Sequence, residues 1–293
     1  AIEALAADDS ADRAALDAAA DSFAVDPCPA WAVVAITFTN KAAQEMKSRL
    51  ATLIGGDNGE SDVLAGTFHS VCLRILRRHA DEAGLRSGFT IYDSDDTKRA
   101  IIACMKELGI DDKTLAPRNV QNTISSAKDR LITPVEFAAA VGNDYNRERI
   151  SGIYDLYQRH LTAANAVDFD DIIMKTVELL RGHDEIRDYY NHRFKYVCVD
   201  EYQDTNGAQF ELIRLLSSGH HNIMVVGDDD QSIYKFRGAQ IENILSFEKN
   251  YEGAKVIRLE QNYRSTTNIL EAANDVIRNN SGRKGKKLWT SKP

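Results

Sequence analysis

Two adjacent carboxylates, Asp200 and Glu201, end a short apolar run in the sequence YVCVDEYQDT (196–205). The segment Val197–Val199 is continuously apolar, which is typical of a strand buried on both faces of a parallel sheet. In open α/β sheets, ligands bind beyond the carboxyl ends of the strands. Phosphoryl transfer needs a metal ion to neutralise phosphate oxygens and a base to orient the nucleophile, and two carboxylates at one strand end could supply both needs.

A simpler alternative is that one of these acids only caps a helix. Asp200 or Asp204 could cap a helix that is expected to begin near Asn206. A cap needs one carboxylate, whereas the sequence places a pair at the strand end. The pair therefore favours a ligand site over a cap.

Five apolar runs share the same design, a short strand pattern that ends in a polar cluster. They are residues 31–40, 62–70, 196–205, 223–232 and 255–265. Helical periodicity follows several of them, and strand–loop–helix repeats of this kind predict a parallel sheet flanked by helices. In such a sheet the polar ends gather along one edge, so we expect these motifs to line a single cleft.

The segment from about residue 88 to residue 190 departs from this pattern and contains several helical stretches with Ser, Asp or Pro at their starts. It carries no strong strand signal. We therefore predict a helical subdomain inserted between the second and third strands. Its boundaries are expected to be exposed linkers near Gly84–Gly88 and Asn165–Val167.

Composition is that of a soluble globular protein: 293 residues, 43% hydrophobic and 27% charged. The length allows two domains. No apolar run approaches the roughly 20 residues of a membrane span, and no secretory signal stands at the start. The four cysteines form no CxxC pair. This argues against a zinc site or a disulfide framework and predicts a reducing, cytoplasmic location.

The net charge of −8 is unevenly distributed along the chain. Residues 1–30 hold seven of the 44 acids and one of the 36 bases, so residues 31–293 carry a net charge of −2. Basic clusters remain in that part, for example in the closing GRKGKKLWTSK. The charge balance therefore neither supports nor excludes DNA as a partner.

The motifs AITFTNKAA, GTFHS, VDFDD, DEYQDT, VGDDDQSIYKFRGA and LEQNYRS occur in that order. With the closing GRKGKKLWT, this series resembles the UvrD/PcrA/Rep family of superfamily 1A DNA helicases over residues 31–293. The resemblance implies an α/β fold, a RecA-like P-loop NTPase parallel sheet with an inserted all-helical subdomain. It assigns residues 1–87 and 166–260 to RecA-like ATPase domain 1A, residues 88–165 to helical insertion 1B, and residues 261–293 to the start of the second RecA-like domain, 2A.

The same resemblance implies an activity and its partners. Family members couple ATP hydrolysis to movement along single-stranded DNA. Mg²⁺ is the implied cofactor and ATP the substrate. The implied partners are single-stranded and partly duplex DNA, with DNA-repair or replication proteins as further partners and no membrane.

By resemblance, five residues serve the nucleotide. Asp200 helps to hold the Mg²⁺ of Mg·ATP, and Glu201 polarises the attacking water. Gln231 senses the γ-phosphate or the water, although a loop amide that bonds local backbone is the alternative. Tyr263 stacks on adenine, and Arg264 contacts the γ-phosphate from the second domain.

By resemblance, aromatic and polar side chains contact single-stranded DNA: Phe38, Asn40, Thr67, His69, Tyr234, Phe236 and Arg237. Stacking suits an enzyme that must grip any sequence, because every base offers a π-face. Taken alone, Phe38 is more typical of a core residue at a strand end, and His69 of a loop histidine. The acids of VDFDD, Asp168, Asp170 and Asp171, match a family motif on the DNA side.

The sequence departs from the family at the phosphate-binding loop, because no GxxxxGK[ST] occurs. The only Gly–Lys pair is Gly285–Lys286, and Lys287 follows where Ser or Thr is required. In the family this loop precedes the strand that matches residues 31–40. We therefore expect a fragment that starts just after the loop, stops early in domain 2A and is inactive alone.

Two other functions are compatible with the residues. One is a non-catalytic scaffold that binds single-stranded DNA without turnover. The weaker one is a two-metal phosphodiesterase built from Asp200, Glu201 and the acid run Asp228–Asp230.

Overall fold

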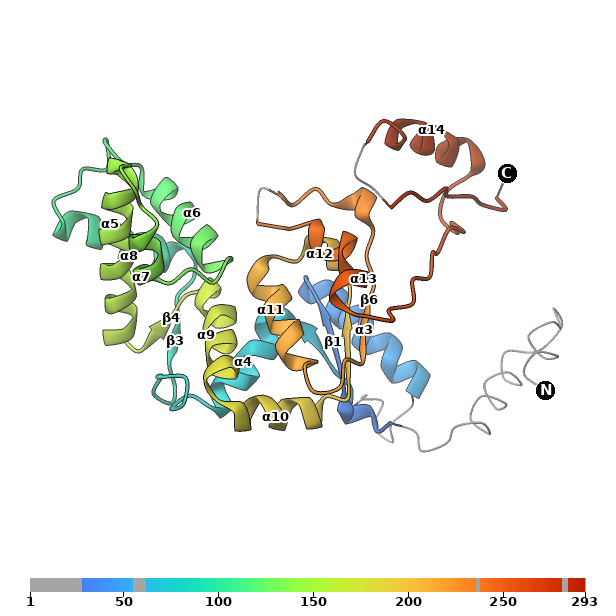
Figure 1. Cartoon of the computed structure of the whole chain (residues 1–293), viewed down its shortest axis with the longest axis horizontal. Helices are drawn as coiled ribbons and strands as arrows, with labels where there is room; N and C mark the ends of the chain where they lie inside the picture. The colour runs from blue at the N-terminus through green and yellow to red at the C-terminus, as the bar shows by residue number, and fades with distance from the viewer. Residues whose placement is uncertain (1–27, 55–61, 236–237, 281–283, 293) are drawn as a thin grey trace.

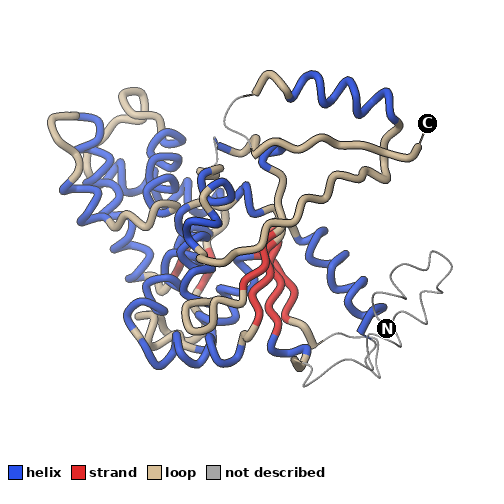
Figure 2. The backbone as a smooth tube through the Cα atoms, turned by 45° about the vertical axis from the view of Figure 1, so that its right-hand side comes forward, coloured by secondary structure: helices blue, strands red, loops and turns tan. Residues whose placement is uncertain are grey.

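A four-stranded parallel sheet forms the centre of the molecule (Figure 2). The computed structural model describes residues 28–54, 62–235, 238–280 and 284–292. The strand order is β2 (Leu64–Thr67), β1 (Val33–Thr37), β5 (Tyr196–Val199) and β6 (Ile223–Val225), and each neighbouring pair is parallel. Four of the five predicted strands therefore form, and the predicted α/β fold with a parallel sheet is confirmed.

The fifth predicted strand, in residues 255–265, does not form. Its only ladder contact is an isolated bridge between Gln261 and Trp289. Val256, Ile257 and Leu259 are 48%, 71% and 79% exposed. A strand needs both a hydrogen-bonding neighbour and a surface on which to bury its side chains, and this run has neither in the described part of the chain.

Helices cover the two faces of the sheet unequally. One face packs on the largest core cluster, which includes Val34, Ile36 and Val197. The helices on that face are α4 (Phe68–Arg78), α9 (Phe169–Gly182), α10 (Asp184–Arg193) and α11 (Gly207–Leu216). On the other face, α3 (Asn40–Ile54) packs mainly on β2 and β1, in a small cluster that includes Met46 and Leu50.

The unequal cover corrects one expectation about β5. The strand was predicted to be buried on both faces, yet Tyr196 is 46% exposed and Cys198 is only half-buried. Met224 of the neighbouring strand is 58% exposed on the same side. Only the face with Val197 and Val199 is fully buried within the described residues.

The predicted helical insertion lies beside the sheet, on the left in Figure 1. Its helices are α5 (Ser94–Glu107), α6 (Pro117–Lys128), α7 (Pro134–Ala139) and α8 (Tyr145–Ala163). Asp93 and Thr133 begin α5 and α7 through reciprocal capping boxes, and Pro117 occupies the first position of α6. These helices share a core of their own around Ile101, Ile124, Tyr154 and Tyr157.

A short parallel ribbon closes the base of the insertion. β3 (Thr90–Ile91) pairs with β4 (Ala166–Val167), and the Asn165 side chain exchanges hydrogen bonds of 2.8 and 3.2 Å with the Arg86 backbone. Most of the Gly84–Gly88 segment is exposed, as predicted. The prediction for Asn165–Val167 is wrong, since Ala166 and Val167 are 1% and 0% exposed because they pair with β3 and pack inward.

A buried ion cluster joins the insertion to α9. The Lys128 side chain is fully buried, and its Nζ lies 2.7 Å from Asp168 Oδ2 and 2.8 Å from Asp171 Oδ1. The Tyr157 hydroxyl donates to the same Asp168 oxygen at 2.9 Å. Burial alone would lower the pKa of Lys128, but the two carboxylates outweigh it and raise that pKa. The cluster therefore holds α6 and α8 of the insertion against the start of α9.

Asp129, next to Lys128, should make folding stability depend on pH. Burial, and then the charge of Asp170, raises the pKa of Asp129 from an ordinary 3.8 to about 7. Between these values the folded state binds more protons than the unfolded state, so this group's contribution to stability falls as pH rises from about 4 to 7. Asp129→Asn should therefore lose less Tm between pH 5 and pH 8 than the wild type.

Thermal melts followed by circular dichroism at both pH values would measure this difference. Asp112→Asn, which changes an exposed acid of the same insertion, is the matched control and should behave as the wild type does. Equal losses of Tm in Asp129→Asn and the wild type would contradict the assignment.

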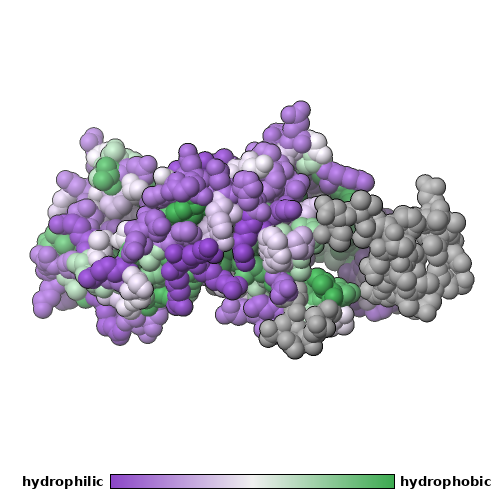
Figure 3. Space-filling model, turned by 90° about the horizontal axis from the view of Figure 1, so that it is seen from below, coloured by the Kyte–Doolittle hydropathy of each residue, from purple (hydrophilic) through white to green (hydrophobic). Residues whose placement is uncertain are grey.

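Among the residues that the structure describes, the remaining elements are three 3-10 helices and three α-helices. They are η1 (Ala30–Ala32), η2 (Tyr202–Asp204), η3 (Asp229–Gln231), α12 (Glu242–Leu245), α13 (Phe247–Asn250) and α14 (Thr267–Ile277). None of the helices in the described ranges combines the length and apolar character needed to span a bilayer. Seen from below, the surface is mostly hydrophilic, with small hydrophobic patches (Figure 3).

Candidate functional site

The two carboxylates lie directly after β5, at the carboxyl edge of the sheet. The Asp200 N–H donates to Ile36 O at 2.9 Å, which extends the pairing of β5 with β1 by one residue. Asp200 is half-buried, and burial raises its pKa, with a further rise from the charge of Glu201. Glu201 is exposed and has a left-handed backbone, with φ 51° and ψ 40°. The sheet thus presents both carboxylates at the predicted edge.

Neither Asp200 nor Asp204 caps the helix that follows, α11. Asn206 caps α11 in a reciprocal capping box with Gln209, with hydrogen bonds of 2.9 and 3.0 Å. The alternative in which Asp200 or Asp204 serves as this cap is therefore wrong. Their carboxylates are left for another role.

Gln203 connects the carboxylate segment to the loop after β6, a role that sequence reasoning missed. It is 1% exposed; its Nε2 donates to Glu201 Oε2 at 2.8 Å, and its Oε1 accepts from the Asp228 N–H at 2.9 Å. Asp228 Oδ2 in turn accepts from Gln231 Nε2 at 2.8 Å. A chain of hydrogen bonds, Glu201–Gln203–Asp228–Gln231, therefore joins two of the five nucleotide-side residues that the resemblance implies.

Close backbone approach makes this chain possible. A Cβ atom on Gly227 would lie 2.6 Å from Gln203 Oε1 and 3.2 Å from the Tyr202 nitrogen. Only glycine fits there without displacing the buried amide. The DEYQDT motif contains Gln203, but nothing in residue spacing shows that its side chain turns inward.

The acid run Asp228–Asp230 forms a cluster of its own. Its ligand atoms lie within 4.8 Å of one another, and among the described residues no acid outside the run belongs to the group. The Lys286 ammonium contacts Asp228, and the Lys284 N–H donates to Asp229 Oδ2 at 2.8 Å. Burial would raise the pKa of Asp228, but hydrogen bonds from Lys286 and Gln231 lower it. Asp200 and Glu201 do not belong to this group, so among the described residues the phosphodiesterase alternative gains no support.

The acids at the end of β5 have the character of a Mg²⁺ site. Asp204 Oδ1 is buried without a hydrogen-bond partner in the described part of the chain. Burial and the charge of Glu201 raise the pKa of Asp204, as they do for Asp200. Mg²⁺ prefers oxygen ligands and needs only one or two carboxylates beside water and phosphate oxygens. Asp200 and Asp204 offer such oxygens, and a cation would offset the cost of burying their charge, so these residues are compatible with the ion that the resemblance implies.

Two residues of the predicted DNA contact set also stabilise the fold. Phe38 is half-buried and packs edge-on against Phe68, with ring centroids 5.2 Å apart. Thr67 is 8% exposed, and its hydroxyl caps α4 by accepting from the Ser70 N–H at 3.3 Å. Asn40 is exposed at the start of α3. Phe38 thus contributes to packing and Thr67 to helix capping, whereas Asn40 is exposed to solvent.

An aromatic pair includes His69, another residue of the predicted DNA contact set. The rings of His69 and Phe169 lie 5.5 Å apart in a T-shaped contact, and burial lowers the pKa of His69. Phe169 is 51% exposed although it is aromatic, and its place among the acids of VDFDD gives no sequence signal for this exposure. Tyr234 is 39% exposed. Phe236 and Arg237 lie outside the described residues.

Tyr263 and Arg264 lie in the segment beyond the sheet. Tyr263 is 73% exposed, and its hydroxyl donates to Gln261 Oε1 at 2.7 Å. Arg264 is exposed, and its N–H donates to Asn262 Oδ1 at 2.9 Å. The hydrogen bonds recorded for these two residues stay within residues 261–292. They are not brought to Asp200 in this arrangement.

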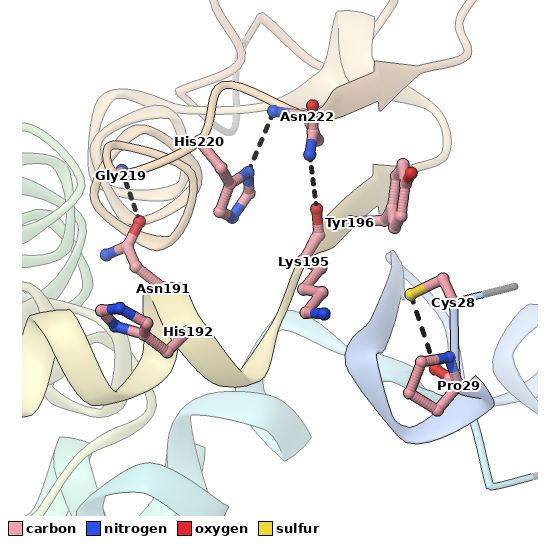
Figure 4. Close-up of a pocket in the computed structure, with 9 residues that line it drawn as sticks. All are labelled: Cys28, Pro29, Asn191, His192, Lys195, Tyr196, Gly219, His220 and Asn222. Carbon is pink, nitrogen blue, oxygen red and sulfur yellow. Dashed lines mark hydrogen bonds between the residues drawn. The ribbon is translucent and has the colours of Figure 1, made fainter. Parts of the chain in front are cut away.

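A separate cavity of about 430 Å³ lies at the opposite end of β5 (Figure 4). Tyr196, the first residue of the strand, lines it, whereas Asp200 follows the last. Two of its polar side chains bond within the fold: Asn191 accepts from the Gly219 N–H at 2.7 Å, and Asn222 donates to Lys195 O at 3.1 Å. This cavity is therefore not part of the carboxylate site.

Comparison with protein families identifies the chain. The model of the UvrD/REP helicase N-terminal domain matches residues 18–252, well over half of the sequence. The chain belongs to the UvrD/REP helicase family. The model of the UvrD-like helicase C-terminal domain matches residues 257–293, the segment that contains Tyr263 and Arg264.

Individual relatives in the UvrD/REP family are similar over most of the chain. It is 50% identical over 260 residues to the ATP-dependent DNA helicase PcrA of Bacillus subtilis, which covers 89% of this chain and 35% of the relative. It is 52% identical over 259 residues to the PcrA of Staphylococcus aureus (strain Mu50), with 88% and 35% covered. The chain thus spans about a third of the length of these relatives.

Proposed function

We propose that this chain forms part of an ATP-dependent DNA helicase, with a nucleotide site and a single-stranded DNA surface at the carboxyl edge of its sheet. The observation that carries the proposal is the hydrogen-bond chain from Glu201 to Gln231. It holds a strand-end carboxylate in a fixed relation to the loop after the next strand, and phosphoryl transfer depends on such positioning. The printed function of the PcrA relatives, ATP-dependent DNA helicase, supports it.

Each nucleotide-side residue has a proposed role. Asp200 would hold Mg²⁺, which when bound neutralises phosphate oxygens. Glu201 would accept a proton from, or orient, the attacking water, and Gln231 would contact that water or the γ-phosphate. Tyr263 and Arg264 would contact adenine and the γ-phosphate from the second domain.

The proposed domain division follows the two packed cores. Residues 1–87 and 166–260 would form domain 1A around the sheet, residues 88–165 the insertion 1B, and residues 261–293 the start of 2A. The separate core clusters of the sheet and of helices α5–α8 support the first boundary. The four free cysteines fit a cytoplasmic location, while partners from DNA repair or replication rest on the resemblance alone.

The proposed DNA surface combines Asn40, Thr67, His69, Phe38 and Tyr234 with Phe236 and Arg237, and we add Phe169. Bases would stack on the exposed rings, whatever the sequence. Phosphate contacts would make binding fall with salt.

Tyr234→Ala and Phe169→Ala should each weaken binding of an oligo(dT) by about fivefold or more, since one base stack is worth roughly 1–3 kcal/mol. Fluorescence anisotropy at two salt concentrations would measure this, with Phe236→Ala in the same series. Tyr145→Ala is the matched control, since it removes a tyrosine that is 69% exposed at the start of α8. If all three variants bind as tightly as the control, the proposed surface is wrong.

A non-catalytic scaffold for single-stranded DNA is the second candidate function. Within the 293 residues, which span about a third of the length of the PcrA relatives, no GxxxxGK[ST] sequence occurs. Single-strand binding by this chain, together with no DNA-stimulated hydrolysis after the chain is joined to a phosphate-binding loop and a complete second domain, would support the scaffold.

A further inference from the structure

Asp129, at the C-terminal end of α6, brings the insertion into contact with the carboxylate segment. Its Oδ1 accepts a hydrogen bond from Asn206 Nδ2 at 2.6 Å. Its backbone carbonyl accepts from the Ala208 N–H at 2.8 Å. Asn206 is the cap of α11 and follows DEYQDT directly. One residue of the insertion therefore makes two bonds to the start of the helix that follows Asp200 and Glu201.

The same carboxylate lies against a second segment, the one that follows Tyr234. A Cβ atom on Gly238 would lie 2.9 Å from Asp129 Oδ2, and one on Gly207 would lie 3.2 Å from the Asp129 carbonyl oxygen. Gly238 also has φ +82°, a conformation that favours glycine. Two glycines from distant parts of the chain thus allow both segments to approach Asp129 closely.

These two segments are also bonded to each other. The Thr205 carbonyl accepts from the Gln240 N–H at 2.9 Å and from Asn243 Nδ2 at 3.1 Å. Asn243 Nδ2 also donates to the Thr205 hydroxyl at 3.0 Å. The end of DEYQDT and the residues after the candidate DNA-contact loop therefore meet at one place, beside Asp129.

The neighbouring residue fixes Asp129 in position. Lys128 is held in the buried cluster by Asp168 and Asp171, so the backbone that bears Asp129 is anchored to the start of α9. Tyr157 of α8 bonds the same cluster. Motion of the insertion would therefore be transmitted to Asp129.

We infer that Asp129 is a positioning residue through which the helical insertion sets the segment after Tyr234 against the segment after Glu201. Its carboxylate touches neither nucleotide nor DNA in this role. The positioning of the two segments does not depend on the proposed function, whereas the expected effect on DNA affinity does. A carboxylate that merely ends α6 would need no contact with Asn206 or Gly238.

Hydrogen exchange followed by mass spectrometry tests the inference without any ligand. In the 293-residue chain, Asp129→Ala should speed amide exchange in residues 205–210 and 238–245 and leave α5 and α8 unchanged. Asp129→Asn keeps an oxygen acceptor for Asn206 and should stay close to the wild type. Asp112→Ala, an exposed acid of the same insertion, is the control. Unchanged exchange in both segments would overturn the inference, and faster exchange throughout α5, α6 and α8 would show a purely structural role.

Oligo(dT) affinity provides the second measurement. Because a loosened segment must be ordered on binding, Asp129→Ala should weaken affinity by about threefold or more, and Asp129→Asn by less. Affinity equal to the wild type, despite faster exchange, would overturn the link to the DNA surface. A wild-type chain that binds no single-stranded DNA would count against the proposed function, and the exchange result would still decide the role of Asp129.

Discussion

The 293-residue chain is expected to bind Mg·ATP weakly and to release no phosphate above background, with or without single-stranded DNA. A phosphate-binding loop supplies backbone N–H groups around the β-phosphate, a lysine for the β- and γ-phosphates and a hydroxyl for Mg²⁺. The sequence contains no such loop. Asp200 and Glu201 cannot substitute for it, because both are anionic and repel a triphosphate. Phosphate-release and equilibrium ATP-binding measurements would check this result.

ATP hydrolysis is expected when the chain is joined to a phosphate-binding loop and a complete second domain. A fusion of this chain to the loop-bearing segment and the remaining second domain of the Bacillus subtilis relative should hydrolyse ATP with DNA stimulation. In that fusion, Glu201→Gln should lower turnover by about 10²-fold or more and spare ATP binding, since it removes only the base. Glu252→Gln, at an exposed acid beyond α13, is the matched control.

The opposite outcome is equally clear. DNA-stimulated phosphate release from the 293-residue chain itself, abolished by Glu201→Gln in the same chain, would show that the phosphate-binding loop is dispensable here.

Lys128→Ala should lower the free energy of unfolding by about 3–5 kcal/mol. The substitution leaves Asp168 and Asp171 buried without their cation, and removal of one partner from a buried ion pair typically has this effect. Both carboxylates are almost fully buried, with side chains 4% and 2% exposed, so water cannot replace the ammonium. Urea unfolding followed by circular dichroism would measure the change.

A surface control and a set of combined substitutions separate the loss of charge from the loss of packing. Lys113→Ala, at an exposed lysine of the same insertion, should change stability by no more than about 0.5 kcal/mol. Adding Asp168→Asn and Asp171→Asn to Lys128→Met should restore part of the lost free energy of unfolding, because that loss comes from the two unpaired carboxylates. If Lys128→Ala loses as little as the control, then the ion cluster does not hold the insertion to α9.

Hydrophobic periodicity was enough to predict most of the fold. Strand runs that end in polar clusters located β1, β2, β5 and β6, and capping residues located the helices of the insertion. The same signal failed in residues 255–265, because a strand pattern does not reveal whether a neighbouring strand is available to pair with it. It also missed β3 and β4, which are only two residues long and form through pairing between distant segments.

Only some residues of the candidate site could be predicted, for a related reason. Asp200 and Glu201 could be placed because strand ends gather at one edge of a parallel sheet. Gln203, Phe169 and Asp129 could not, since their roles depend on which way a side chain points and on which distant segment it meets. Spacing along one chain contains neither kind of information.

The left-handed backbone at Glu201 has a consequence for evolution and engineering. With φ 51°, a residue that bears a Cβ atom costs roughly 1–2 kcal/mol of folding stability relative to its relaxed conformation, and glycine would avoid that cost. The hydrogen bond that the buried Gln203 amide donates to this carboxylate opposes that cost, so an acceptor oxygen and a relaxed backbone are in conflict at this position. Selection of this chain for heat resistance, without a demand for turnover, would be expected to favour asparagine here, which tolerates the left-handed backbone and keeps an oxygen for Gln203 at the expense of the carboxylate.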